Sequence, residues 1–267
     1  MLAAEHILAT ESIPFADCRV PYPQLLMRRM EQAGVSSPAC SVLMLAVPYR
    51  TSRVRGNISA YAAARDYHLF FHMLYEKLLP HLRQKYPCNW FLAFSDHSPI
   101  AEVDAAVKSG LGVRGDMGML LTREYGSYVF LGEIISSLPP VSASGRSDAT
   151  CEHCGACRRA CPSPAHCLSD LTQTKGELTE QTKQLMRTVH TAWGCDVCQE
   201  VCPWNVRAKQ SEVPFFQEQC IPNLTREAVL SMSKAEFATR AFSWRGRACI
   251  LRNLAVLEEA KLSAQKN

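Results

Sequence analysis

The chain has 267 residues, enough for one sizeable core or two smaller domains. Hydrophobic residues make up 47% and charged residues 20%, a balance that excludes a disordered chain. The net charge of +4 permits a polyanionic partner without requiring one. The longest strongly apolar run, residues 42–47, is far too short to span a bilayer, and the N-terminal residues do not resemble a signal peptide. We therefore expect a cytoplasmic protein that does not associate with membranes.

Strands and helices are predicted in turn along the first part of the chain. Short apolar runs predict three buried strands, at residues 41–47, 90–94 and 128–131, the last continuing towards Ile135. Between them, residues 58–86 predict one long helix whose apolar stripe includes Met73. A further helix is predicted from Pro99 to Gly110, because proline is favourable at the first helical position.

The rest of the chain contains a predicted linker and a predicted helical tail. Residues 138–147 are rich in proline and serine and predict a linker, whereas residues 222–262 have a helical pattern. The glycines at 110, 112 and 115 fit a dinucleotide-binding pattern, but that pattern requires a strand before it and a helix after it. Because a helix is predicted before these glycines, we do not expect nucleotide binding.

Eight of the thirteen cysteines fall between residues 151 and 202. Disulfides rarely persist in the cytosol, so this density indicates a metal centre. Residues 151–162 have the ferredoxin spacing Cys-x2-Cys-x2-Cys-x3-Cys-Pro, in which the fourth cysteine serves a second cluster. Residues 195–203 repeat its second half, and Cys167 supplies the remaining ligand. Crossing the fourth ligands predicts two 4Fe–4S clusters. Cluster 1 takes Cys151, Cys154, Cys157 and Cys202, and cluster 2 takes Cys161, Cys167, Cys195 and Cys198.

A pair of zinc sites is the alternative, because zinc also accepts four thiolates. Zinc sites rarely use the four-cysteine run that ends in Cys-Pro, and they have no reason to cross ligands, so iron–sulfur clusters are the better interpretation. Two clusters carry electrons one at a time from a donor to an acceptor. A plain ferredoxin would not need the preceding 145 or so residues, so we expect the acceptor to bind there.

The cysteine segment resembles a known family. Residues 194–205, Gly-Cys-Asp-Val-Cys-Gln-Glu-Val-Cys-Pro-Trp-Asn, resemble the second cluster motif of the epoxyqueuosine reductase family. Further similar segments follow the family order between about residue 41 and residue 257. They are residues 59–68, 95–102, 124–133, 171–176 and 243–247, with the pair Arg252–Asn253.

The resemblance implies a cobalamin-dependent reductase. In this family the corrinoid lies between the N-terminal domain and the ferredoxin domain, and the clusters reduce its cobalt. The substrate is an epoxide on the queuosine precursor in the tRNA anticodon loop, and an aspartate that maps onto Asp96 protonates the leaving oxygen. The resemblance also implies contacts to the corrinoid and the substrate. The cofactor-binding residues would be Ser59, Asp96, Leu120, Leu131, Ser169 and Thr172, and Lys175 would face the substrate.

Asp96 can also be interpreted without the family. It follows a predicted strand and precedes a predicted helix, a place where α/β folds often hold ligands. A general acid must be protonated near pH 7, so burial against an apolar corrinoid would have to raise its pKa. The alternative is an ordinary N-cap or turn aspartate.

The chain departs from the family pattern in three places. The segment between Cys161 and Cys167 is shorter than usual, and Asp116 and Met117 replace a lysine–asparagine pair. The C-terminal helical-repeat region that helps many members grip tRNA does not follow. We therefore expect weaker tRNA binding, through a modest set of basic residues. They are Lys175, Arg187, Arg207, Lys209, Arg240, Arg245 and Arg247.

Together these predictions define an α+β protein with three parts. An α/β corrinoid-binding domain spans residues 1–145, a ferredoxin-like two-cluster domain spans 146–212, and a short helical tail spans 213–267. The predicted function is reduction of epoxyqueuosine in tRNA, with electrons from a cytosolic donor such as a flavodoxin or a ferredoxin. Two alternatives stay open. One is a related corrinoid reductase that acts on a small molecule or on another corrinoid protein, and the other is an electron carrier without its own substrate.

Overall fold

The computed structural model describes residues 7–9, 12–52, 55–141 and 150–264 and shows a mixed helix and sheet protein. These residues divide into two compact units. The sheet unit comprises Met1–Pro48, His68–Cys154 and Arg207–Lys209. The helical unit comprises Tyr49–Tyr67, Gly155–Val206 and Gln210–Asn267. The predicted linker at residues 138–147 falls mostly outside the described residues.

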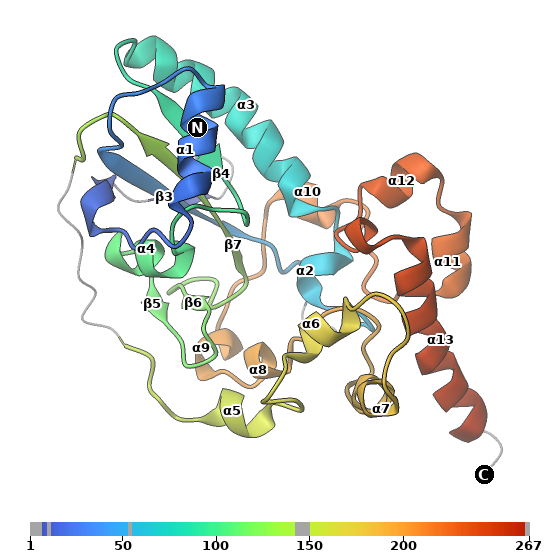
Figure 1. Cartoon of the computed structure of the whole chain (residues 1–267). Coiled ribbons are helices and arrows are strands. Elements are labelled where there is room, and N and C mark those ends of the chain that lie inside the picture. The colour runs from blue at the N-terminus through green and yellow to red at the C-terminus, as the bar shows by residue number, and fades with distance from the viewer. Residues whose placement is uncertain (1–6, 10–11, 53–54, 142–149, 265–267) are drawn as a thin grey trace. The chain divides into compact units, whose positions relative to one another are not determined.

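An antiparallel sheet forms the centre of the sheet unit (Figure 1). Strands β3 (Ser41–Pro48) and β7 (Val129–Ser136) pair along their whole length, and β4 (Phe91–Phe94) extends the sheet beyond β7. The short strands β1 (Leu8–Ala9) and β2 (Ile13–Pro14) both pair with β3. The three predicted buried strands are therefore confirmed. Every pair in this sheet is antiparallel, however, so the expectation of an α/β arrangement was wrong, and the rule that places ligands at the ends of parallel strands does not apply.

Helices cover both faces of this sheet. On one face, α1 (Pro23–Gln32) and α4 (Glu102–Lys108) join an apolar cluster with Met44 and Ile135 of the sheet. On the other face, α3 (Tyr67–Lys85) packs closely on Gly132, where a β-carbon would lie 2.3 Å from the Phe71 ring. Within α3 the fully buried residue is Phe71, whereas Met73 is 45% exposed, so the predicted apolar stripe was wrong at Met73.

The single helix predicted over residues 58–86 is in fact two helices. A short α2 (Ala60–Ala63) ends at Ala64, whose backbone is extended, and α3 begins at Tyr67. The break is made by tertiary hydrogen bonding within the helical unit: the Asp66 N–H donates to the Thr239 carbonyl over 2.7 Å. A partner that is distant in sequence thus overrides the local helical preference.

The glycine-rich segment has the context predicted for it. Helix α4 precedes the glycines, and the small hairpin of β5 (Val113–Arg114) and β6 (Leu120–Leu121) follows. No helix starts there to receive a pyrophosphate.

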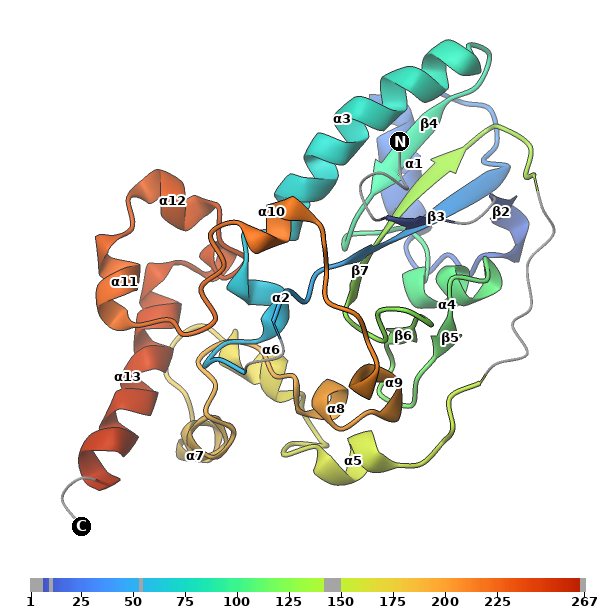
Figure 2. The same ribbon diagram turned by 180° about the vertical axis from the view of Figure 1, so that it is seen from behind.

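The helical unit consists of short helices and one long C-terminal helix (Figure 2). Its core includes Trp193, Met186, Phe242 and Ile250. Its helices after α2 are α5 (Ala156–Ala160), α6 (Leu168–Thr172), α7 (Glu180–Val189), α8 (Val197–Glu200), α9 (Pro203–Val206), α10 (Pro214–Gln217), α11 (Arg226–Ser231), α12 (Lys234–Ala238) and α13 (Arg247–Ala264). None of the described helices is long and apolar enough to cross a membrane.

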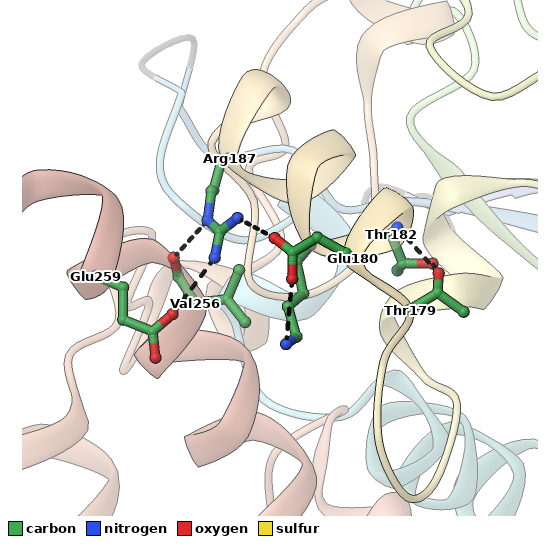
Figure 3. Close-up of polar contacts among 7 residues, drawn as sticks. Thr179, Glu180, Thr182, Arg187, Val256 and Glu259 are labelled. Carbon is green, nitrogen blue, oxygen red and sulfur yellow. Dashed lines mark hydrogen bonds and ion pairs between the residues drawn. The ribbon is translucent and has the colours of Figure 1, made fainter. Parts of the chain in front are cut away.

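The C-terminal helices pack with the cysteine segment in one unit. The buried Asn253 amide of α13 donates to the Thr172 and Ala192 carbonyls, each over 2.7 Å. At the other end of this contact, Arg187 of α7 joins Glu180 to Glu259 of α13 (Figure 3). The predicted helical tail is confirmed as helix. The contacts group it with the cysteine segment, however, and residues 49–67 group there too, which differs from the three-part division that the sequence predicted.

Candidate functional site

Four of the predicted cluster ligands come together in the helical unit. Cys161 follows α5, Cys167 caps α6, and Cys195 and Cys198 lie at α8, which packs against α5. Burial, together with the nearby thiols of Cys195, Cys167 and Cys161, raises the pKa of the Cys198 thiol to about 12. Thiols that raise one another's pKa can all ionise only beside a metal centre. This is the set that the sequence assigned to cluster 2.

The cysteines assigned to cluster 1 are divided between the two units. Cys157 in α5 and the buried Cys202 belong to the helical unit, whereas Cys151 and Cys154 belong to the sheet unit. Their assignment to one cluster stays a prediction.

Asp116, one of the departures from the family, lies beside the first cysteine. Its Oδ1 is 2.8 Å from Nδ1 of His153, and ligand atoms of Asp116, Cys151 and His153 lie within 4.8 Å of one another. Asp116 is therefore paired within the chain and does not project alone into solvent.

Ser59 is buried and holds the half-buried Asp196, which lies between Cys195 and Cys198 in the chain. The Ser59 hydroxyl donates to Oδ1 of Asp196, and the Ala60 N–H donates to Oδ2 over 2.7 Å. The Gln199 amide donates to Oδ1 over 3.0 Å. Burial raises the pKa of Asp196, and these donors oppose the rise. Close packing requires glycine at 194, where a β-carbon would lie 2.4 Å from that of Ser59. The predicted corrinoid contact of Ser59 stays a prediction.

The residues predicted after Cys167 fall in and just beyond α6. Thr172 is fully buried, its hydroxyl donating to the Ser169 carbonyl over 2.8 Å and accepting from the Gly194 N–H over 2.9 Å. Ser169 is half-buried, and Lys175 is exposed beyond the helix. The structure thus gives Thr172 a structural partner and leaves Lys175 accessible.

Asp96 lies in the sheet unit, directly after the edge strand β4. Its side chain is 65% exposed, and its Oδ2 lies 3.6 Å from Nε2 of His68 at the start of α3. Its backbone has a φ of +65°, which is uncommon for a residue with a side chain. The N-cap of α4 is Ala101, so the interpretation of Asp96 as an N-cap is wrong. His68 was missed by sequence reasoning, although it ends the family-like segment 59–68.

A cleft of about 630 Å³ opens beside Asp96, between α1, α3 and β4. Ser95 and His97, the neighbours of Asp96 in the chain, both line it. Its walls carry three histidines and two arginines against one glutamate. They are His68, His72, His97, Arg29, Arg83 and Glu76. The cleft is mostly apolar, with a small excess of cationic side chains that can face an anionic group near Asp96.

Two glutamates that the sequence analysis did not single out lie behind Asp96. Glu133 of β7 is 0% exposed and faces Glu102, the first residue of α4. Burial, reinforced by the charge of Glu133, raises the pKa of Glu102 to about 9, and burial raises the pKa of Glu133 to about 7. The sequence analysis did not single out Glu133 because the residue lies within an apolar run that predicts a strand.

The predicted corrinoid-facing leucines belong to one apolar cluster of the sheet unit. Leu120 on β6 is buried, and Leu131 on β7 is half-buried. Only Leu131 offers apolar surface in this structure, and both contacts stay predictions.

Several of the predicted phosphate-binding cations have structural partners instead. Arg187 pairs with Glu180 and Glu259 (Figure 3). Arg240 is buried and donates to the Gln219 carbonyl over 2.6 Å. The rest of the set is mixed. Arg247 donates to the Val229 and Met232 carbonyls, Lys209 pairs with Glu124 over 3.2 Å, Arg245 stacks on Trp244, and Lys175 and Arg207 are exposed.

Comparison with known proteins gives consistent matches. Residues 29–96 match the family described as epoxyqueuosine reductase QueG, DUF1730. An epoxyqueuosine reductase from Lactococcus garvieae is 34% identical over 227 residues, covering 78% of this chain and 62% of the relative. One from Listeria monocytogenes is 31% identical over 255 residues, covering 88% of this chain and 66% of the relative. The chain thus spans somewhat less than two thirds of the length of these relatives.

Solved structures agree with these matches. The epoxyqueuosine reductase from Streptococcus thermophilus superposes with a TM-score of 0.77 at 23% identity, covering 96% of this chain and 78% of that one, which shows a shared fold. An epoxyqueuosine reductase bound to an epoxyqueuosine-modified tRNA-Tyr stem loop gives a TM-score of 0.73 at 25% identity, covering 94% and 76%. The Bacillus subtilis enzyme, with its catalytic aspartate loop swung out of the active site, gives 0.72 at 25% identity with the same coverage.

These matches agree in fold, in sequence and along nearly the whole chain, and they identify a reductase family. The chain belongs to the epoxyqueuosine reductase family.

Proposed function

We propose that this protein is a cobalamin-dependent iron–sulfur reductase that converts epoxyqueuosine in tRNA to queuosine. The observation that carries the proposal is the agreement between the family and the site. The relatives are epoxyqueuosine reductases, and the sheet unit presents the Asp96 carboxyl beside His68 at a cleft with cationic side chains.

The donor set fits two 4Fe–4S clusters. The thiols of Cys161, Cys167, Cys195 and Cys198 influence one another's ionisation in the helical unit, as the ligands of one cubane must. Cys151, Cys154, Cys157 and Cys202 would hold the second cubane, in the crossed order of a ferredoxin. The clusters would receive electrons from a flavodoxin or a ferredoxin and pass them on singly.

The proposed corrinoid contacts are the residues that the family resemblance implies. Leu131 supplies half-buried apolar surface, and Leu120, Ser59, Ser169 and Thr172 are the other proposed contacts. When bound, cobalamin supplies a reduced cobalt that can attack the epoxide carbon. The residues of this chain have a separate task, which is to orient the substrate and to deliver a proton to the departing oxygen.

Asp96 is the proposed proton donor. Its carboxyl faces outwards next to a cleft, and its loop follows the edge strand, so it can approach a substrate without rearrangement of the sheet. In the Bacillus subtilis relative the catalytic aspartate also lies on a loop that can leave the active site. His68, 3.6 Å from Oδ2, would orient the Asp96 carboxyl or replace its proton after turnover.

The tRNA would be bound through its anticodon loop, and the relative solved with an epoxyqueuosine-modified tRNA stem loop supports tRNA as the substrate. Because Arg187, Arg240 and Arg247 are engaged within the helical unit, fewer cations are available for phosphates than the sequence predicted. Lys175 and Arg207 are the exposed candidates, and the base itself would be flipped out for reaction.

The test is an anaerobic assay of the reduced, reconstituted protein on two substrates, epoxyqueuosine-containing tRNA and the free epoxyqueuosine nucleoside. Queuosine formed only in tRNA supports the proposal. Comparable rates with the nucleoside would assign a small-molecule reductase. If neither is reduced while corrinoid binds, reduction of another corrinoid protein becomes the better assignment. If no corrinoid binds, an electron carrier becomes the better one.

A further inference from the structure

Glu133 lacks a hydrogen-bond partner although the sheet surrounds it. It lies on β7, opposite Phe94 of β4 and Met44 of β3, and its side chain is 0% exposed. Within the described residues, neither of its oxygens nor Oε1 of Glu102 has a hydrogen-bond partner. The Ser98 hydroxyl and the Glu102 carboxyl face Glu133 without forming a bond of good geometry.

Two carboxylates cannot remain side by side in this setting. Each buried charge without a partner costs several kcal/mol, and two like charges add repulsion. A single proton removes both penalties, because a protonated Glu102 can donate to Glu133. The remaining titratable groups that face the pair are Asp96, Tyr75 and Cys18, and each of them can add negative charge but no cation. No lysine, arginine or histidine in the described part of the chain completes a hydrogen bond to Glu133.

The pair also contacts the backbone of the proposed proton donor. The Asp96 N–H donates a hydrogen bond to the Glu102 carboxyl. The left-handed conformation of Asp96, with a φ of +65°, is unfavourable for a residue with a side chain, so it needs such an anchor. Glu102 therefore connects the buried Glu133 to the loop that presents Asp96.

We infer that Glu102 and Glu133 share a proton and act as a positioning pair that fixes the backbone of Asp96 for catalysis. The role of the pair in catalysis rests on the proposed function, whereas the pair and its contact to Asp96 are features of the structure alone. The predicted consequence is a loop that the Asp96 N–H ties to Glu102, with a buried repulsion that destabilises the surrounding sheet unit once both carboxyls ionise.

The first test measures stability and needs no substrate. A carboxyl whose pKa is higher in the folded than in the unfolded chain binds more protons when folded, so stability falls as pH rises between those two values. For Glu102 the window runs from the ordinary 4.5 to about 9. The Tm of the reconstituted protein should therefore fall across this window more steeply than the Tm of Glu102→Gln, whose amide imitates the protonated carboxyl.

Glu31→Gln, which alters an exposed carboxyl on α1, is the matched control and should follow the wild-type curve. Any pH dependence of the Tm that comes from the cofactors is the same in all variants, so it cancels when their Tm curves are compared. Parallel Tm curves for Glu102→Gln and the wild type would overturn the shared proton, whether or not the protein reduces epoxyqueuosine.

The second test measures turnover. Glu102→Ala removes the acceptor of the Asp96 N–H and should lower kcat by about tenfold to hundredfold with little change in KM, because a catalytic group is misplaced while the substrate contacts remain. Glu102→Gln keeps that acceptor and should restore much of the loss. It should also reduce the fall in kcat at alkaline pH. Iron and corrinoid contents should match the wild type in both variants. A kcat for Glu102→Ala equal to that of the wild type would overturn the positioning role.

Discussion

Two carboxylates, the half-buried Asp196 in the helical unit and the fully buried Glu133 in the sheet unit, differ in the donors around them. Asp196 in the helical unit accepts hydrogen bonds from Ser59, Ala60 and Gln199, whereas Glu133 in the sheet unit has no hydrogen-bond partner among the described residues. Burial raises the pKa of both, and the three donors to Asp196 form hydrogen bonds of good geometry, whereas Ser98 and Glu102 oppose the rise at Glu133 without such bonds. The supply of donors, together with the depth of burial, decides whether a carboxyl serves as an ionised structural anchor or as a holder of a proton.

The largest expected effect comes from removing the anchored carboxylate. Asp196→Ala would leave the Ser59 hydroxyl, the Ala60 N–H and the Gln199 amide without their acceptor, so the free energy of unfolding should fall by about 3–5 kcal/mol. Anaerobic urea unfolding followed by circular dichroism measures this change. Asp170→Ala, at an exposed aspartate of α6, is the control and should have a small effect. Similar losses in both variants would remove the contrast between anchored and unanchored carboxylates.

The next effect concerns Asp96, the exposed third carboxylate. Asp96→Asn keeps size and polarity but cannot supply an acidic proton, so turnover should fall by about a hundredfold or more while clusters and corrinoid remain bound. Single-turnover kinetics on epoxyqueuosine-containing tRNA provide the measurement. Unchanged turnover when chemistry limits the rate would exclude the role of proton donor.

A smaller effect of opposite sign is expected at Glu133. Glu133→Gln removes a buried group that must bind a proton, so it should raise the free energy of unfolding by roughly 1–3 kcal/mol at pH 8 and by much less at pH 5. The sign follows because the raised pKa of Glu133 makes the wild type lose stability as pH rises above the ordinary value of 4.5. Urea midpoints at the two pH values test this, and destabilisation of Glu133→Gln at pH 8 would contradict the raised pKa of Glu133.

The smallest effects separate structural cations from cations that bind tRNA. Arg187→Ala should lower the urea midpoint slightly and leave tRNA affinity unchanged, because its guanidinium is already paired with Glu180 and Glu259. Lys175→Ala should leave the midpoint unchanged and reduce the salt dependence of tRNA binding by about one unit of slope. Binding titrations at several salt concentrations measure this. A smaller salt dependence for Arg187→Ala, with none lost in Lys175→Ala, would contradict both assignments.

The same contrast explains what the sequence could predict. The cluster ligands could be predicted from the sequence because a cluster needs cysteines at short fixed spacings. In the structure Cys161, Cys167 and Cys195 lie near Cys198, and their role as ligands stays a prediction. The strand that contains Glu133 could also be predicted, from its apolar neighbours. The pairing of Glu133 with Glu102 could not be predicted, because the two residues come from separate elements and no local sequence pattern indicates that they lie close together. The break between α2 and α3 was missed for the same reason, since it depends on Thr239 far along the chain.

The most direct measurement for the central claim is the cofactor content of the anaerobically reconstituted chain. With iron, sulfide and hydroxocobalamin supplied, we predict about eight irons and eight sulfides per chain, together with one corrinoid. Electron paramagnetic resonance of the cob(II) form should show no nitrogen splitting from a histidine ligand. Cys167→Ala should damage one cluster and leave most of the other. Zinc in the thiolate sites despite excess iron, or a chain that binds no corrinoid, would contradict the account.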